Sequence, residues 1–432
     1  MRPSASIVHR MTDSMLPLRS FLAAVLVTCF ITVGPAVADD TQKPAAVADE
    51  EKPAEEKEDE EKDPEAVTVR YDNGLRLESG DGNFKARIRF RAQTRGSSLS
   101  SEDLAGEDDG LEEASGFRVQ RARFKIDGHV YRPWLEYYLE YGIARGAMLT
   151  FQFDLQSTEK IGVRVGQYKV LYNRERVDSS GAQQFADRSI VNSPFTLDRQ
   201  QGLTVMGRLF AGTLADSSYA GGVFTGSGRG GDLENDHRPM YIGRWQWNFL
   251  KRDLPFSQSD IRRRKEPAAS LAFAGASSHG EFTRFSSSGG GQLPGFEGGD
   301  ADRYKLKQWL AEFAYHGKGL SIQSEYHWKE IDDTVDNVVS DFSGWYAQAG
   351  YFLHEAFDSF PEPLEIAFRY ARVDSGEGIV LPSDRELIIG GNWFFNGHNN
   401  KLTLDYSVLK STLHLGSEDT GWRVRAQWDI SF

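Results

Sequence analysis

Four basic side chains share one face of a single predicted strand. Within residues 84–92 every second residue is basic, and the residues between them are apolar. The basic positions are Lys85, Arg87, Arg89 and Arg91. Side chains at alternate positions of a strand point to the same side about 6.5 Å apart, so these charges repel one another unless water or acidic groups surround them. Ammonium and guanidinium groups arrayed in water offer charge-assisted hydrogen bonds to small anions.

A second basic strand follows, with Arg121, Arg123 and Lys125, although its alternation slips near Arg121. The strand after it carries the acids Glu136 and Glu140. One interpretation is a basic wall that attracts anions. The other is that the two acids neutralise the cations as salt bridges within the wall. The residue types allow both.

Residues 170–200 form the longest predicted connection, too long for a simple turn, and connections of this length are usually functional. Its charged residues include Arg174, Glu175, Arg176, Asp187, Arg188, Asp198 and Arg199. We expect it to fold inward and form a constriction, with Arg174 and Arg176 as the main anion-binding groups. Lys169 would lie at the approach and Arg188 nearby, while Glu175 would position the segment. The alternative is a solvated external loop.

The elements that must position these residues are strands of about ten residues with alternating polarity. In the last one, Trp422, Val424, Ala426, Trp428, Ile430 and Phe432 alternate with Arg423, Arg425, Gln427, Asp429 and Ser431. Tilted at about 40°, such a strand covers the roughly 25 Å apolar band of an outer membrane. A soluble β-sandwich also alternates. Aromatic residues near the segment ends and charges stacked on the polar faces favour a barrel with a wet lumen instead.

Counting back from the C-terminus gives sixteen candidate strands, an even number, as bacterial single-chain barrels require. They are 419–432, 400–411, 384–395, 363–373, 342–352, 319–330, 305–316, 268–276, 239–250, 216–225, 201–210, 160–169, 147–155, 134–144, 116–128 and 84–95. The predicted fold is all-β, a transmembrane antiparallel β-barrel with an inward-folded constriction loop. With the C-terminus in the periplasm the long connections fall outside, and 251–267 is an awkwardly long inner one. Residues 66–83 precede the wall.

The N-terminal region predicts export. Residues 1–38 combine Arg2, Arg10 and Arg19 with an apolar stretch at 21–33 and an Ala-Val-Ala site, so we expect a signal peptide cleaved after Ala38. The only cysteine, Cys29, lies within it, which excludes disulfides and thiolate metal sites from the mature chain. Residues 39–65 hold 13 acidic and 4 basic residues and predict a disordered or loosely helical periplasmic linker before the barrel domain, 66–432.

Other chemistry is not indicated. No serine–histidine pairing at strand spacing presents itself, so we expect no catalytic residues and no enzyme. The nine histidines show no helical i, i+4 pairs, and we expect no metal or cofactor. The basic run at 261–265 is short and isolated and is interpreted as a solvated turn, without a nucleic-acid partner.

Four stretches resemble the phosphate-selective porin O and P family. They are residues 116–123, similar to an early strand with an RRAR core; 134–141; 166–169 with 174–175 and 187–189, similar to the strand that leads into the constriction loop; and 402–406 with 424–432. Two departures occur. Gln120 replaces the usual first arginine of the core, and Val170-Leu171 replaces the proline that usually follows Lys169 closely.

The resemblance implies a sixteen-stranded homotrimeric porin of the Gram-negative outer membrane, with an inward third loop and a basic lumen, although Glu136, Glu140 and Glu365 dilute that charge. We expect passive diffusion of small anions such as phosphate or pyrophosphate. The alternatives are a general porin for small polar solutes and a structural barrel that anchors the acidic segment to the cell wall. Expected partners are phosphate, outer-membrane lipids and the barrel-assembly machinery, which reads a terminal strand ending in an aromatic residue such as Phe432.

Overall fold

The computed structural model describes residues 66–100, 107–108, 111–112, 115–231, 238–285, 290–298, 302–376, 383–412 and 418–432. They belong to one compact unit, residues 63–432. The predicted signal peptide at 1–38 and the predicted acidic linker at 39–65 lie outside the described residues.

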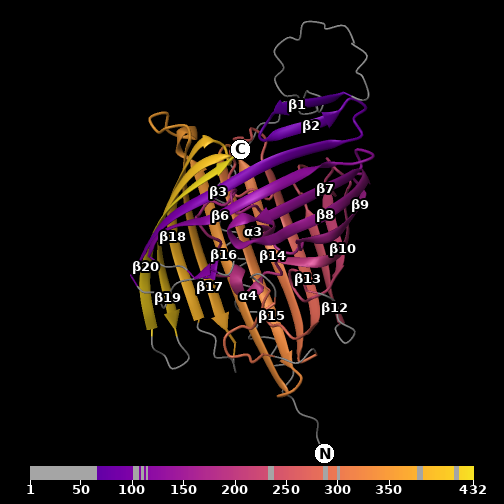
Figure 1. Cartoon of the computed structure of the whole chain (residues 1–432). Helices are drawn as coiled ribbons and strands as arrows, with labels where there is room; N and C mark the ends of the chain where they lie inside the picture. Colours follow the sequence, from indigo (N-terminus) through magenta and orange to yellow (C-terminus); the bar gives the residue numbers. More distant parts are fainter. Residues whose placement is uncertain are drawn as a thin grey trace, which may run out of the picture. The chain divides into compact units, whose positions relative to one another are not determined.

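Sixteen antiparallel strands of the described chain pair in sequence order and close into a ring, because the last strand pairs with the first (Figure 1). They are β3 (Lys85–Leu99), β6 (Gly116–His129), β7 (Leu135–Gly142), β8 (Ala147–Thr158), β9 (Ile161–Lys169), β10 (Arg199–Leu209), β11 (Ser217–Phe224), β12 (Arg238–Trp247), β13 (Ala268–Gly280), β14 (Tyr304–Gly317), β15 (Leu320–Asp333), β16 (Val338–Phe352), β17 (Leu364–Ser375), β18 (Ser383–Asn396), β19 (Asn400–Thr412) and β20 (Glu418–Ser431). The prediction of an all-β antiparallel barrel of about sixteen strands is confirmed.

Four shorter strands lie beside this ring. β1 (Val67–Tyr71) and β2 (Leu75–Ser79) form a hairpin, and β2 pairs with the first residues of β3. β4 (Glu107–Asp108) and β5 (Leu111–Glu112) pair only with each other within the described chain. The segment at 66–83 therefore precedes the ring, as predicted.

Phe432 completes the seam where the barrel closes. Its backbone N–H donates to the carbonyl of Phe90 at 2.9 Å, and its carbonyl accepts from the N–H of Phe90 at 2.7 Å. The two rings stack with centroids 6.0 Å apart. Deleting Phe432 removes both bonds and the terminal aromatic, so we expect less heat-modifiable barrel in the outer membrane while export continues. A normal yield of folded barrel after the deletion would contradict this assembly role.

The two faces of the wall differ as the alternation predicts. On β20 the tryptophans Trp422 and Trp428 are exposed, whereas Arg423 and Arg425 are buried. The polar positions of β15 and β17 are likewise buried and point inward, including Glu325 and other charged residues. Exposed apolar side chains on the outside and buried polar ones within are the reverse of a soluble sandwich.

The slip in alternation near Arg121 is a β-bulge. Gln93 pairs with Arg121 but Thr94 pairs with Val119, so Gln120 is the extra residue of the bulge. Gln120 and Arg121 are both buried, as expected where a bulge turns two successive side chains to one side.

The connections differ between the two ends of the ring. At one end, here called the turn end, β14 and β15 join through Lys318 and Gly319. Their φ values of 50° and 74° fit a two-residue type I′ hairpin. We call the opposite end the loop end, because 170–198 and 281–303 connect strands there. One turn-end connection, residues 248–267, is also long, and we call it the turn segment.

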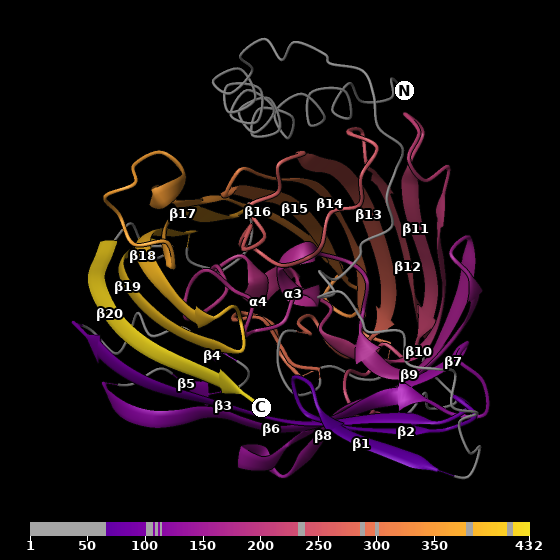
Figure 2. The same ribbon diagram turned by 90° about the horizontal axis from the view of Figure 1, so that it is seen from above.

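The connection 170–198, here named the inner segment, lies inside the ring. It contains the short helices α3 (Arg174–Val177) and α4 (Asn192–Phe195), which Figure 2 shows among the surrounding strands. Two single-turn helices, η1 (Ile143–Arg145) and η2 (Leu353–Glu355), lie between strands. No helix of the described residues is long and apolar enough to cross a membrane.

The inner segment packs into an apolar core that sequence alternation does not predict. Val170, Phe195 and Leu197 of the segment join inward-facing apolar residues of β12 to β17 and buried residues of the connection 281–303. One part of the interior is therefore a packed core rather than a wet wall.

Candidate functional site

The first basic strand is paired with an acid that sequence analysis did not name. The Nε and Nη2 atoms of Arg87 donate to Asp127 of β6 at 3.1 and 2.8 Å, and Arg89 donates to the same carboxylate. The alternative interpretation named Glu136 and Glu140 as the neutralising partners, and for these two arginines that alternative is wrong. Arg87 and Asp127 are directly opposite in register. Lys85 lies half-buried at the start of β3.

The next cation along β3 turns toward the interior and holds the inner segment. Arg91 is buried and donates to both carboxylate oxygens of Asp429 at 2.8 and 2.7 Å. Its third bond, at 3.0 Å, reaches the hydroxyl of Ser180. Because Arg91 is paired with a carboxylate, its main role is to position the inner segment rather than to attract a solute.

The cations of the inner segment also have partners. Arg174 donates to Glu312 of β14 at 2.9 Å, and Arg176 donates to Asp198 at 2.7 Å. Arg188 donates to the backbone carbonyls of Glu175 and Asp178 at 2.9 and 3.0 Å. The structure thus places these three predicted anion-binding residues where they fix the shape of the segment. That they bind a solute stays a prediction.

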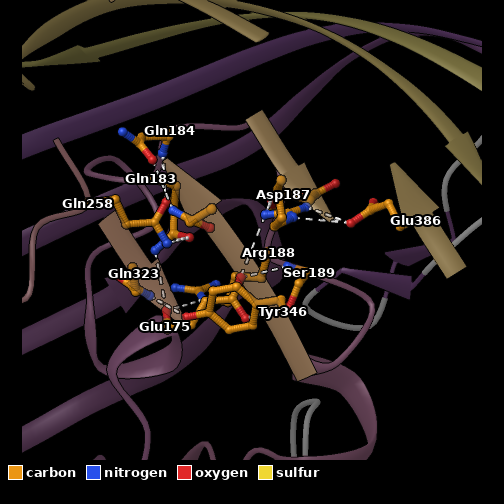
Figure 3. Close-up of polar contacts among 12 residues, drawn as sticks. Glu175, Gln183, Gln184, Asp187, Arg188, Ser189, Gln258, Gln323, Tyr346 and Glu386 are labelled. Atoms are coloured by element: carbon orange, nitrogen blue, oxygen red, sulfur yellow. Dashed lines mark hydrogen bonds and ion pairs between the residues drawn. The ribbon is translucent and has the colours of Figure 1, made fainter. Parts of the chain in front are cut away.

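Glu175 lies where a positioning residue is expected. Its carboxylate accepts hydrogen bonds from the backbone N–H and the hydroxyl of Ser189 at 2.7 and 2.8 Å, across the fold of the segment (Figure 3). Its own N–H donates to Glu325 of β15 at 2.7 Å. Burial raises the pKa of the Glu175 carboxyl. Glu175 therefore fixes the inner segment to the wall and also joins two parts of the segment to each other.

The turn segment enters the ring from the other end and meets the inner segment. The side chain of Gln258 accepts from the N–H of Gln184 at 2.8 Å and donates to the side chain of Gln183 at 2.9 Å (Figure 3). Gln184 also donates to Glu365 of β17 at 2.7 Å. These contacts hold the inner segment against the strands near the C-terminus.

A cavity of about 250 Å³ remains on the opposite side of the inner segment, and we call it the basic cavity. It lies between strands β6 to β10 and the inner segment. Its lining residues are Arg123, Lys125, Tyr138, Glu140, Thr150, Gln152, Arg164, Lys169, Leu171, Val177, Ser179 and Arg199. Five of them are cations and one is a carboxylate, so the lining carries a strong excess of positive charge.

Glu140 organises these cations without neutralising them. Its carboxylate lies 2.6 Å from Arg123, 3.1 Å from Arg199 and 4.0 Å from Lys125. Arg199 also lies 3.5 Å from Asp198, which pairs with Arg176 as well, so two carboxylates serve four cations and leave two positive charges in excess. The sequence alternative that Glu140 forms wall salt bridges is therefore correct for its neighbours, whereas Glu136 is exposed and pairs in register with His129.

Lys169 adds a fifth basic group, which is oriented by backbone carbonyls. Its Nζ donates to the carbonyls of Val177 and Asp178 at 3.2 and 2.7 Å. These carbonyls orient the amino group without adding a negative charge. A cavity that is lined by one sign of charge and enclosed by low-dielectric walls concentrates the opposite ion.

A second, smaller cavity continues toward the loop end. It shares Arg123 and Arg199 with the basic cavity, and it adds Arg121, Arg145 and Arg229 to the cations. Four of the eleven predicted site residues, Arg121, Arg123, Lys125 and Lys169, therefore line these two cavities, and the other seven do not.

Arg164 is the cavity residue that sequence analysis missed. It alternates with Val163 and Val165, both on the apolar side of β9, and that pattern could have revealed its inward direction. In the structure it donates to Asp154 of β8 at 2.6 and 2.9 Å. Arg199 was seen only as a charged residue of the long segment, but it lies opposite Lys169 in register.

Asp178 of the inner segment makes the cavity sensitive to pH. Burial raises the pKa of its carboxyl to about 7, although Lys169 and Arg188 oppose the rise. The group is neutral at lower pH and becomes negative as pH rises through that value, which weakens the positive potential near Lys169. We expect chloride preference to fall between about pH 6 and pH 8, and Asp178→Asn to abolish the change. Zero-current potentials at both pH values measure this; an equal pH dependence in Asp178→Asn would refute it.

The raised pKa of the Asp178 carboxyl also affects the stability of the fold. A carboxyl whose pKa is raised in the folded state stabilises the fold fully below its unfolded pKa, and this contribution is lost as pH rises through about 7.

Comparisons with known proteins agree with this architecture. Residues 90–429 match the family described as phosphate-selective porin O and P. A comparison with curated protein sequences finds no match.

Solved outer-membrane proteins share the fold at low sequence identity. The loop L8 deletion mutant of OmpT from Vibrio cholerae is 10% identical, with a TM-score of 0.52, over 81% of this chain and 100% of that chain. An anion-selective porin from Comamonas acidovorans is 11% identical, with a TM-score of 0.51, over 80% and 99%. The channel DcaP of Acinetobacter baumannii is 10% identical, with a TM-score of 0.50, over 81% and 98%.

Proposed function

The chain belongs to the phosphate-selective porin O and P family, and from this membership we propose that it lets small anions such as phosphate diffuse passively through the basic cavity. Family and fold are those of an outer-membrane channel rather than an enzyme. The more specific proposal, that this porin conducts anions, rests on the charge of the residues that line the basic cavity.

The observation that carries the proposal is a cavity lining with five cations and one carboxylate, in which Arg164 has a close carboxylate partner of its own, Asp154, on the neighbouring strand β8. At about 4 Å and an effective dielectric near 20, each cation attracts a unit anion by roughly 4 kcal/mol before desolvation is subtracted. Desolvation and competition from Glu140 reduce that attraction. A channel requires such a balance, because the ion must enter readily and still leave.

The fold is compatible with the proposal. One structural neighbour is described as an anion-selective porin, so this barrel architecture can carry anion selectivity. Phosphate is the anion we propose first, because planar guanidinium groups such as those of Arg123 and Arg199 match the oxygens of a phosphate.

The test is the zero-current potential of the purified channel in a planar bilayer across a gradient of potassium chloride. We expect a sign that corresponds to chloride preference, and a chloride current that falls when phosphate is added. No ion preference together with rapid swelling of liposomes in neutral sugars would overturn the proposal in favour of a general porin for small polar solutes.

Export and assembly belong to the same proposal. We propose that residues 1–38 are removed as a signal peptide, that the barrel-assembly machinery inserts the chain among outer-membrane lipids, and that three copies associate. Sequencing the N-terminus of the mature protein and measuring the mass of the detergent complex test the first and last points. An N-terminus at Met1 or a monomeric mass would contradict them.

A further inference from the structure

Three cavities lie end to end beside the inner segment. The basic cavity shares Arg123 and Arg199 with the cavity nearer the loop end. It shares one residue, Leu171, with a third cavity of about 400 Å³. The third cavity reaches the turn end, because it is lined by Glu159 and by Asp253 of the turn segment. Together the cavities trace an off-axis route along the half of the ring made by β6 to β12.

The inner segment and the turn segment pack against the other half of the ring. Arg174 of the inner segment donates to the carbonyl of Pro255 in the turn segment at 2.6 Å and to Glu312 in the wall. Ser259 of the turn segment donates to Glu365 at 2.8 Å. With the glutamine contacts and the apolar core, these bonds fix both segments in front of β13 to β18.

Leu171 is held at the junction by its neighbours on both sides. Val170 is 2% exposed and packs in the apolar core, and its N–H donates to the carbonyl of Asp198 at 2.8 Å. The N–H of Tyr172 donates back to the carbonyl of Val170 at 2.8 Å, which makes Leu171 the central residue of a three-residue turn. With its neighbours anchored in this way, the half-buried Leu171 side chain lines the cavities instead of the core.

Leu171 lies between two cavities of different lining. On one side are the cations of the basic cavity. On the other side the third cavity has a mixed lining, in which the apolar residues Met206, Leu254, Pro255 and Phe256 accompany Glu159, Arg208, Arg244 and Asp253. An apolar constriction slows hydrated solutes because it offers no replacement for the water that they lose, and it can close by dewetting.

We infer that Leu171 is the residue that sets the size limit and the conductance of this route, separately from the cations that set its charge preference. The inference rests on the proposed function, because it assumes that solutes pass through the basic cavity.

The test combines truncation and enlargement of this one side chain. We expect Leu171→Ala to raise single-channel conductance about twofold and to admit larger neutral sugars, and Leu171→Trp to lower conductance by a similar factor. The ratio of anion to cation permeability should stay as in the wild type. Ile190→Ala is the matched control, because Ile190 belongs to the same segment but packs against the apolar core.

A second variant avoids dependence on folding of the truncated chain. Apart from Cys29 the chain has no cysteine, so Leu171→Cys in a Cys29→Ser background can be modified after the channel has folded. Thiol reagents of increasing size should reduce the current stepwise. Conductance that stays unchanged in Leu171→Ala, in Leu171→Trp and after modification would overturn the inference. A wild-type channel without anion preference would instead overturn the proposed function, since charge preference and conductance are measured separately.

Discussion

Replacing Lys125 by glutamate and Lys169 by glutamine is expected to abolish most of the anion preference of the channel. The double change removes three units of positive charge from a lining of five cations and one carboxylate. Since each nearby unit charge contributes roughly 4 kcal/mol before desolvation, we expect the ratio of chloride to potassium permeability to fall by about tenfold or more. These two lysines are chosen because Lys125 lies 4.0 Å from Glu140 and Lys169 donates to backbone carbonyls, so the buried guanidinium pairs stay intact.

The matched control changes two lysines outside the cavity in the same way. Lys307→Glu with Lys305→Gln alters charge by the same amount on β14, where both side chains are at least half exposed. Its zero-current potential should remain that of the wild type. If both double variants keep the wild-type potential, the basic cavity does not set selectivity.

Glu312→Gln is expected to release the inner segment from the wall. The Glu312 carboxylate accepts from Arg244 at 2.8 and 3.0 Å and from the Nε and N–H of Arg174 at 2.9 and 3.2 Å, and its side chain is fully buried. Removing its charge leaves two buried guanidiniums without their shared anion, which costs about 3–5 kcal/mol. The heat-modifiable barrel should therefore unfold at a clearly lower temperature, and the open-channel current should become noisier.

Glu330→Gln on the neighbouring strand is the control for Glu312→Gln. Its ion pair with Lys307, at 3.2 Å, is largely exposed, and such pairs contribute about 0–1 kcal/mol. The unfolding temperatures of the two variants should differ clearly. Equal unfolding temperatures would mean that the Glu312 contacts do not hold the segment.

Strand positions were predictable because alternation is local. The predicted strand at 400–411 corresponds to Asn400–Thr412, and that at 363–373 corresponds to Leu364–Ser375. The prediction at 268–276 stops short of Gly280, because strands continue past the apolar band and lose their alternating polarity there. Inward direction followed from the same pattern for Arg123 and Lys125, and both line the basic cavity.

Partners were not predictable, because they depend on register and on long-range packing. The choice of Asp127 as partner of Arg87 follows from the pairing of β3 with β6, which the bulge at Gln120 shifts. Arg174 meets Glu312 across 138 residues of sequence. The turn segment was expected as a long inner connection, but nothing local in its residues signals that Gln258 reaches the inner segment.

The most direct test of the proposed route through the basic cavity determines which part of the interior solutes reach. Gln152 lines the basic cavity, whereas Gln323 is a buried inward residue of β15, on the side where the inner and turn segments pack against the wall. Gln152→Cys and Gln323→Cys, each in a Cys29→Ser background, are exposed to an anionic thiol reagent while current through the reconstituted channel is recorded. We expect rapid modification and loss of current at position 152 and little reaction at position 323. Rapid modification at 323 with none at 152 would place the route on the other side of the inner segment and contradict it.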